Sequence, residues 1–414
     1  MDFRRSLLLL FMAFIVAACA PEKPPQTAGP YDGESLETKI KVLQNLASVG
    51  DAEAQFALGL AHLEGKGVSQ DDMAAAGWFE RGAHREHAPS QNSLASMYRL
   101  GRGVPQNHRT AFDWYKRAAA RGDSDAQTSL GVYFGNGLAG PRDQDLAVKW
   151  LRRAAEQGNP TAQFNLANRY LNGAGVSRSE QEAAKWMKRA AEQGEVDAQF
   201  DLAEMFSEGE GVSKSKAIAA EWMKRAAEQG SAKAQVKLGE MYMEGSGVPK
   251  SVDVAVPWFR RAAEQGNSEG QYNLGVAFVS GEGVRRNYDE ARRWFESAAK
   301  QKHALAIIGL ADIFYYGQGV SKDPSQAAKW LLIGSIVVDE MFTEISRRTS
   351  KGELTIISKE FRDEMVKWTK GKSERREKFE EFLNEIPADH REKVRGQADQ
   401  WLYDHRDVPV YVPE

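Results

Sequence analysis

Few side chains in this sequence have the type and spacing that chemistry would need. His84 and His87 stand three residues apart, so a helix would bring both within reach of one metal ion. The chain has one cysteine, and no carboxylate or cysteine completes an obvious ligand set around these histidines. No serine stands in the Gly-x-Ser-x-Gly motif of hydrolases. We therefore expect no metal, no cofactor and no catalytic residue, and hence a protein that is not an enzyme.

A Gly-x-Gly-Val motif could be mistaken for a phosphate-binding loop. It recurs seven times, beginning at Gly65, Gly101, Gly173, Gly209, Gly245, Gly281 and Gly317. A dinucleotide-binding loop needs a preceding strand and a third glycine. Here a predicted helix precedes each motif, and two glycines within three residues end a helix. The motifs therefore predict structural turns.

The only cysteine, Cys19, follows a segment typical of an export signal. Arg4 and Arg5 precede an apolar run over residues 7–18. A helix of that length spans about 18 Å, short of the ~30 Å hydrocarbon core of a bilayer. Residues 1–18 are therefore predicted to be a signal peptide, and the mature chain to be exported.

Residues 16–19, Val-Ala-Ala-Cys, resemble the lipobox of bacterial lipoproteins. The resemblance implies that Cys19 is lipidated and becomes the N-terminus after cleavage. Several acyl chains on one residue give stable anchoring. No aspartate follows Cys19, which implies the outer membrane, with the folded body facing the periplasm. The alternative is an ordinary signal peptide with a chance cysteine. Residues 19–33 are rich in proline and are predicted to be a lipid-anchored flexible linker.

The overall composition is that of a folded chain without a nucleic-acid-binding charge. Of the 414 residues, 42% are hydrophobic, enough to form a core. The net charge is −3, from 55 basic and 58 acidic residues, whereas nucleic-acid binding needs a basic excess. We expect no nucleic-acid partner.

Tryptophans recur with a period of 36 residues through the middle of the chain. Eight of the ten follow this spacing: Trp78, Trp114, Trp150, Trp186, Trp222, Trp258, Trp294 and Trp330. Such regularity indicates an array of repeats. Ten turns of one long helix would also give this period, but the glycine motifs interrupt every repeat. Each repeat is therefore predicted to contain two helices.

Fixed positions around each tryptophan define these two helices. Seven residues before it stands an Asp, Asn or Ser, such as Asp71 and Ser215, which suits a helix N-cap. Alanine three before the tryptophan and alanine or glycine four after it complete one face of this helix B. Twelve and sixteen residues after the tryptophan, a small residue and a leucine mark helix A of the next repeat, as in Ala162 and Leu166. The sequence Gly-Asn-Gly-Leu over 135–138 predicts one turn that starts two residues early and is longer than the others.

One helical hairpin cannot bury its own apolar stripe, so stacking of neighbours into an α-solenoid is expected. The predicted class is all-α, with about eight repeats over residues 51–337 and the tryptophans filling the gaps between repeats. Residues 34–50 are predicted to be a half-repeat that caps the N-terminal end, because Val42 stands where a tryptophan would fall.

The pattern resembles the Sel1-like repeat family, relatives of the tetratricopeptide repeat. The resemblance is clearest over residues 162–194, from Ala162-Gln163 through Tyr170 and Trp186 to Gly194. It implies a scaffold with protein partners and names none of them. The family's stop glycine is replaced at three places, by Glu86, Lys302 and Val338.

Residues 338–414 are predicted to form a C-terminal helical capping region. A final helix opening near His390 would place Val394, Ala398 and Trp401 on one face and cover the last repeat. Helices are also expected over 331–345, 354–368 and 374–386. Residues 338–385 are either part of a bulky cap or a separate interaction element.

The candidate binding surface is the concave face, which helix A lines in related solenoids. Positions fifteen and eighteen after each tryptophan lie away from the leucine stripe and vary between repeats. The candidates are Asn165, Asn168, Asp201, Glu204, Lys237, Glu240 and Asn273. They would hydrogen-bond an extended chain or a partner helix, or they form an ordinary solvated face. The predicted function is a membrane-anchored periplasmic scaffold for protein partners in an envelope complex; a glycan-binding or peptidoglycan-binding envelope protein is the alternative.

Overall fold

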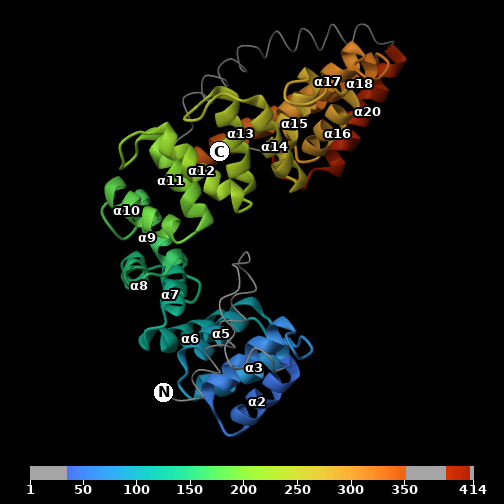
Figure 1. Cartoon of the computed structure of the whole chain (residues 1–414). Coiled ribbons are helices and arrows are strands. Elements are labelled where there is room, and N and C mark those ends of the chain that lie inside the picture. Colours follow the sequence, from blue (N-terminus) through green and yellow to red (C-terminus); the bar gives the residue numbers. More distant parts are fainter. Residues whose placement is uncertain (1–34, 351–387, 411–414) are drawn as a thin grey trace. The chain divides into compact units, whose positions relative to one another are not determined.

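The computed structural model describes residues 35–350 and 388–410, and every regular element in these ranges is an α-helix (Figure 1). A first helix, α2 (Leu36–Ser48), precedes eight helical hairpins. Their bounds are α3 (Ala52–Glu64) with α4 (Asp72–His84), α5 (Ala88–Leu100) with α6 (His108–Ala120), α7 (Ser124–Asn136) with α8 (Gln144–Glu156), α9 (Pro160–Asn172) with α10 (Glu180–Glu192), α11 (Val196–Glu208) with α12 (Lys216–Glu228), α13 (Ala232–Glu244) with α14 (Val252–Glu264), α15 (Ser268–Ser280) with α16 (Tyr288–Ala299), and α17 (Ala304–Tyr316) with α18 (Pro324–Ser350). A last helix, α20 (Ala388–Asp404), follows. The predicted all-α array of eight repeats is confirmed.

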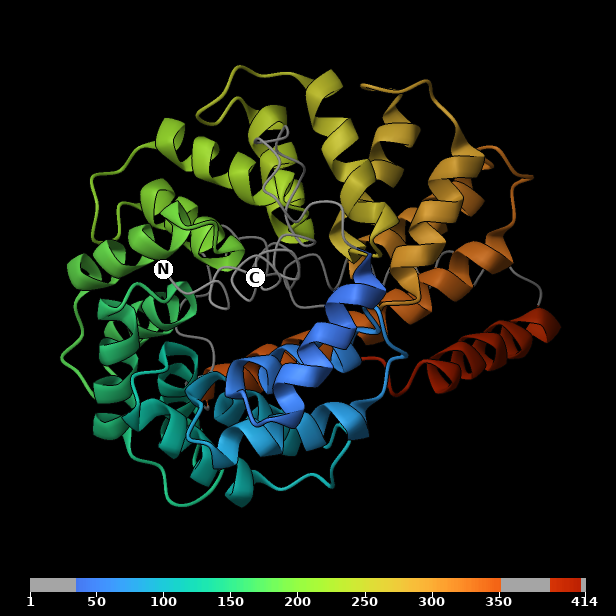
Figure 2. The ribbon, with the colours of Figure 1, turned by 60° about the horizontal axis from the view of Figure 1, so that its bottom comes forward.

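The chain divides into two compact units, which we describe separately. Unit 1 runs to Ala198 and includes residues 210–212, and unit 2 contains residues 199–209 and the chain from Ser213. Within each unit consecutive helices pack antiparallel, as the hairpins of unit 1 from α3 to α10 show in Figure 2. Odd-numbered helices of neighbouring repeats also touch, as α13 touches α15 and α15 touches α17. We call the odd-numbered helices from α3 to α17 the A helices, and the side that they share within each unit the A-helix face.

Side-chain caps fix where the helices begin and end. Asp71 accepts a hydrogen bond from the backbone N–H of Ala74 at 2.9 Å, and Ser215 accepts one from Ile218 at 3.4 Å, as the N-cap prediction requires. The predicted long turn after α7 is wrong. Gly137 ends α7 in the left-handed conformation at φ 70°, in register with the other repeats, and α8 starts in register too. Gly135 lies inside the helix, and the guanidinium of Arg169 packs where a Cβ at this position would stand.

The core between repeats is made of small residues and leucines, with the tryptophan rings packed against it: Trp186, Trp222 and Trp330 are buried, and the other five periodic tryptophans are half-buried. Leu130, Leu166 and Leu202 have no exposed surface. Trp114 packs against the cluster of its own repeat and against that of the preceding one, so it fills the space between them. Trp222 is 8% exposed, and the guanidinium of Arg225 lies 4.3 Å from the centroid of its ring. Six repeats share this pair of tryptophan and arginine, which shields the outer face of the ring.

A ladder of glutamines links the two helices of a hairpin to each other and the hairpin to the one before it; it was not predicted from the sequence. One rung of this ladder consists of two hydrogen bonds made by a glutamine of an A helix. On α13, the side-chain amide of Gln235 donates to the carbonyl of Ala227 at 3.1 Å, and its Oε1 accepts from Gln265 at 2.8 Å. The glutamine pairs lie 30 residues apart: Gln127 with Gln157, Gln163 with Gln193, Gln199 with Gln229, Gln235 with Gln265, and Gln271 with Gln301. Among the described residues, the buried Oε1 atoms of Gln55 and Gln91 lack a partner, because Arg85 and Arg121 stand where the donor glutamine would be.

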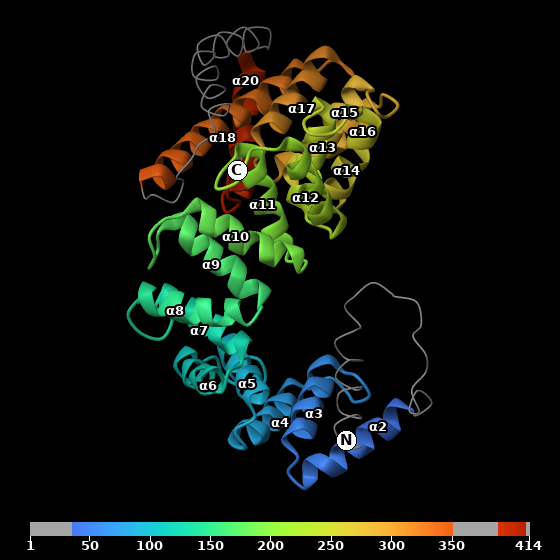
Figure 3. The same ribbon diagram turned by 60° about the vertical axis from the view of Figure 1, so that its left-hand side comes forward.

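The C-terminal helix closes unit 2. Val394 and Ala398 of α20 are buried, and α20 packs along α18 (Figure 3). Trp401 meets Trp330 edge to face, with 5.8 Å between ring centroids. The predicted apolar face of the last helix is thus confirmed. Helix α18 is continuous from residue 324 to 350, so the proposed boundary at residue 338 falls inside a helix. The expected helices over 354–368 and 374–386 lie outside the described residues.

Candidate functional site

The structure places the seven predicted surface residues on four successive A helices. Asn165 and Asn168 lie on α9 in unit 1, whereas the other five lie on α11, α13 and α15 in unit 2. All seven side chains are half-buried. They stand beside the buried leucines without joining the core, because positions fifteen and sixteen after the tryptophan point about 100° apart on a helix. This intermediate burial leaves their polar groups accessible while their stems are packed.

In unit 1 this surface is made of uncharged amides and hydroxyls. Thr161, Asn165, Asn168 and Asn172 follow one another along α9 at helical spacing. Each Asn can donate and accept hydrogen bonds at once. Such a row matches the alternating donors and acceptors of an extended peptide backbone.

In unit 2 the same surface is charged. The ammonium of Lys237 lies 3.4 Å from the carboxylate of Glu240, one turn further along α13. Burial opposes the charge on Lys237, but the nearby charges of Glu240, Glu204 and Glu269 prevail and hold the pKa of Lys237 above its ordinary value. For Glu240 burial prevails over the attraction of Lys237, so the pKa of Glu240 is raised. Carboxylates from three helices therefore converge around one lysine.

A hollow with an apolar floor opens beside this charged group. It has a volume of about 190 Å³ and lies between α13 and α15, over α14. Val256 and Phe259 of α14 are buried and form its floor, while Met243 forms a wall. The rim carries two of the predicted residues, Glu240 and Asn273. The hollow thus joins a polar edge to an apolar base.

The sequence analysis missed the apolar residues of this hollow. Val276 is 40% exposed and occupies position eighteen after Trp258, where the two preceding repeats carry Glu204 and Glu240. A valine where the two preceding repeats carry glutamates was the available signal. Met243 is partly buried against the core, and only the structure shows that it also borders open space.

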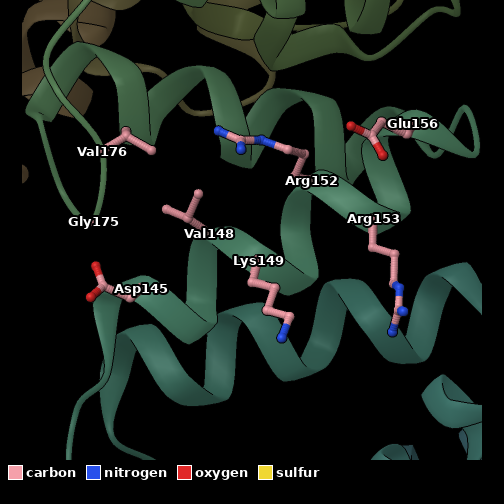
Figure 4. A pocket seen from close by; sticks show the side chains of 8 residues that line it. All are labelled: Asp145, Val148, Lys149, Arg152, Arg153, Glu156, Gly175 and Val176. Carbon is pink, nitrogen blue, oxygen red and sulfur yellow. The ribbon is translucent and has the colours of Figure 1, made fainter.

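A second hollow of about 430 Å³ lies along the exposed side of α8 in unit 1 (Figure 4). It is bordered by Lys149, Arg152 and Arg153, with Val148 and Val176 between them. The basic groups do not converge, because Lys149 and Arg153 extend away from Val148 in Figure 4. The guanidinium of Arg152 donates to the hydroxyl of Tyr170 at 2.9 Å, and that of Arg153 lies 5.3 Å from the ring centroid of Trp150. Two of its three cations thus serve local contacts.

His84 and His87 are not brought together as metal ligands. His84 lies against the ring of Trp114, with 5.6 Å between centroids, and is mostly exposed. His87 caps helix α5, its Nδ1 accepting the backbone N–H of Ser90 at 3.3 Å. In the part of the chain that the structure describes, no three His, Cys, Asp or Glu side chains are grouped as a metal would require.

The predicted lipid-attachment residue Cys19 lies outside the described residues, as do the signal peptide and most of the linker. Within 35–350 and 388–410, no helix combines the length and apolar character needed to cross a bilayer.

The pattern of the Sel1 repeat matches eight consecutive segments that together cover residues 52–335. A solved Sel1 repeat protein from Oxalobacter formigenes is 33% identical, with 75% of this chain and 86% of that chain covered and a TM-score of 0.55. The protective antigen c5321 of uropathogenic Escherichia coli is 25% identical over 97% of this chain and 84% of its own, with a TM-score of 0.47. A Sel1 repeat protein from Klebsiella pneumoniae is 21% identical over 49% of this chain and 98% of its own, with a TM-score of 0.35. Among curated proteins no match is found.

Proposed function

Because the chain belongs to the Sel1 repeat family, we propose that it is a scaffold or adaptor that binds protein partners on its A-helix face and catalyses no reaction. The observation that carries this proposal is the row of half-buried polar side chains on successive A helices, with an apolar hollow beside them in unit 2. Repeats of this kind present extended surfaces on which a peptide or a helix can lie.

The proposed place of action is the cell envelope, with the chain anchored in the outer membrane through lipid on Cys19 and facing the periplasm. The support is the sequence of residues 1–19, a short apolar segment ending in small residues and a cysteine. We expect the wild-type chain to incorporate labelled palmitate and to fractionate with membranes. Cys19→Ser should abolish both, and a variant that stays membrane-bound and labelled would contradict the anchor.

The proposed role is to hold a partner within an envelope complex for assembly, secretion or signalling. A photo-reactive residue placed at Asn273, on the rim of the hollow, should cross-link one or a few envelope proteins in living cells. The same residue placed at Glu228, exposed on α12, is the matched control and should give no such product. Equal cross-linking from both positions, or none from Asn273, would contradict the scaffold role of this face.

A glycan is the second candidate ligand, because one exposed aromatic ring lies on the A-helix face. Tyr316 of α17 is 66% exposed and meets Tyr315 edge to face, with 4.9 Å between ring centroids. Exposed rings of this kind can stack on sugars. Pull-down on peptidoglycan separates the two candidates: retention lost on Tyr316→Ala supports glycan binding, and no retention of the wild-type chain excludes peptidoglycan as the ligand.

A further inference from the structure

The A-helix face of unit 2 carries an acidic strip. We give this name to the side chains fifteen, eighteen and twenty-two positions after the tryptophan on α11 and α13. They are Asp201, Glu204 and Glu208 on α11, and Lys237, Glu240 and Glu244 on α13. Five carboxylates thus accompany one lysine. The equivalent positions on α9 hold Asn165, Asn168 and Asn172, so the charge belongs to these repeats and is not a feature of every repeat.

The strip runs into the apolar hollow. Glu240 and Glu244 belong to the strip and also line the hollow, whose far side is formed by Val276 and Ala277 of α15. Glu282, in the turn after α15, adds another carboxylate to the lining. A ligand lying along the strip would therefore meet acidic groups over two helices and then an opening with an apolar floor.

We propose that this face binds a cationic amphipathic segment of a partner protein, with lysines or arginines on the acidic strip and one large apolar side chain in the hollow. The proposal rests on the scaffold function proposed above and specifies the chemistry of its partner. The occupant follows from charge complementarity: an acidic segment would be repelled by the excess of carboxylates. A neutral extended chain could accept hydrogen bonds from none of these carboxylates and would donate only its backbone N–H groups to them, without the attraction between opposite charges.

The surroundings of Glu240 explain why this charge is effective. Its side chain is 35% exposed and lies between neighbouring A helices, where burial raises its pKa. A carboxylate that is partly removed from water interacts more strongly with an incoming cation than a fully hydrated one does. The single lysine of the strip, Lys237, is already held by Glu240 and by the charges of Glu204 and Glu269. It therefore adds little repulsion toward a basic ligand.

Binding of a defined peptide to the purified full chain tests the proposal. The probe is a fluorescein-labelled 16-residue peptide of lysine and leucine at helical spacing, and its control has every lysine replaced by glutamate. We expect the lysine peptide to bind, with an affinity that falls as salt rises, and the glutamate peptide not to bind. Replacing the central leucine by alanine in the peptide should weaken binding severalfold, because the hollow would lose its occupant.

The matched protein variants separate the strip from overall charge. Glu204→Gln/Glu240→Gln/Glu244→Gln should weaken binding at least tenfold. Glu221→Gln/Glu228→Gln/Glu264→Gln changes the net charge equally, at exposed positions of α12 and α14, and should change the affinity less than twofold. Equal effects of the two triple variants would overturn the proposal, as would preference for the glutamate peptide. Circular dichroism spectra of both variants verify that each is folded.

Two further outcomes distinguish this inference from the scaffold function itself. The strip variant is Glu204→Gln/Glu240→Gln/Glu244→Gln. If cross-linking from Asn273 yields the same partner in this variant as in the wild-type chain, the scaffold role stands and the proposal of a cationic partner segment is wrong. If the strip instead holds a second copy of this chain, sedimentation will show a dimer that the strip variant abolishes, and that also overturns the proposal. If the cross-linked partner is lost in the strip variant and kept in the control variant of α12 and α14, the result supports both the scaffold role and the cationic partner segment.

Discussion

Removing one hydrogen bond of the glutamine ladder tests directly how much the ladder stabilises a hairpin of the array. In Gln265→Ala the side-chain amide that donates to Gln235 at 2.8 Å is lost. Gln235 is 3% exposed, so its buried Oε1 would lose the donor that Gln265 supplies. An unsatisfied buried acceptor costs about 1–3 kcal/mol, and we expect the free energy of unfolding to fall by that amount.

The assay must be local, because arrays of repeats do not always unfold in one step. Hydrogen exchange of peptides from α13 to α15 should become faster in Gln265→Ala, whereas exchange in α3 to α5 should not change. In a Gln235→Ala background the acceptor is absent, so Gln265→Ala should then cost almost nothing. A loss of stability equal in both backgrounds would refute the reasoning.

Adding a missing hydrogen bond to the ladder, by Arg121→Gln, should stabilise the chain. The Oε1 of Gln91 is buried without a partner among the described residues, and Arg121 stands at the donor position. Arg121→Gln would supply the missing rung but lose the ion pair with Glu86, which joins the two side chains at 2.7 Å. Glu86 is exposed, and such a pair contributes at most ~1 kcal/mol. We expect a net gain of about 1 kcal/mol in urea unfolding; a loss would mean that the rung does not form.

Three other substitutions have defined outcomes. Glu86 is a non-glycine residue at φ 64°, a conformation that costs about 1–2 kcal/mol, whereas its exposed ion pair with Arg121 contributes at most ~1 kcal/mol. Glu86→Gly should therefore raise stability in urea unfolding, and a destabilised variant would contradict the assignment of strain. Trp222 is 8% exposed between repeats, so Trp222→Ala should lower the free energy of unfolding by about 3–5 kcal/mol. An unchanged melting curve would show that its ring does not pack. Because the pKa of Glu240 is raised in the folded chain, ionisation of Glu240 disfavours folding at pH 7 and ceases to do so once pH falls below the ordinary carboxyl value. Glu240→Gln should therefore be at least as stable as wild type at pH 7, with the difference vanishing near pH 4, and a variant less stable at pH 7 would mean that the Lys237 pair dominates.

The sequence predicted most of the fold, because the signals that define it are local. Asp71 and Ser215 were identified as N-caps from their residue type and their distance from a tryptophan, and each accepts the expected backbone N–H. The glutamine ladder also repeats in the sequence. Its pairing could not be predicted, since Gln235 and Gln265 lie 30 residues apart, near the start of α13 and just after α14, and meet only when these two helices pack side by side.

The candidate surface was predicted only in part. Helical spacing was sufficient to place Glu240 and Asn273 on the A-helix face, where both border the hollow. It was not sufficient to find the hollow, because Phe259 belongs to a different helix and its exposure depends on the gap between α13 and α15. Likewise, residues 135–138 suggested an early turn, whereas contact with Arg169 explains why a glycine stands at 135 inside the helix.

The contact between Trp401 and Trp330 has a consequence for how many hairpins the array can contain. A stack of similar hairpins has no intrinsic end, and an uncovered last hairpin would accept the first hairpin of another molecule and so seed a filament. With α20 lying on α18, that place is filled by a helix of the same chain. The ring of Trp401 thus covers a face of the last hairpin that would otherwise be open to a second copy.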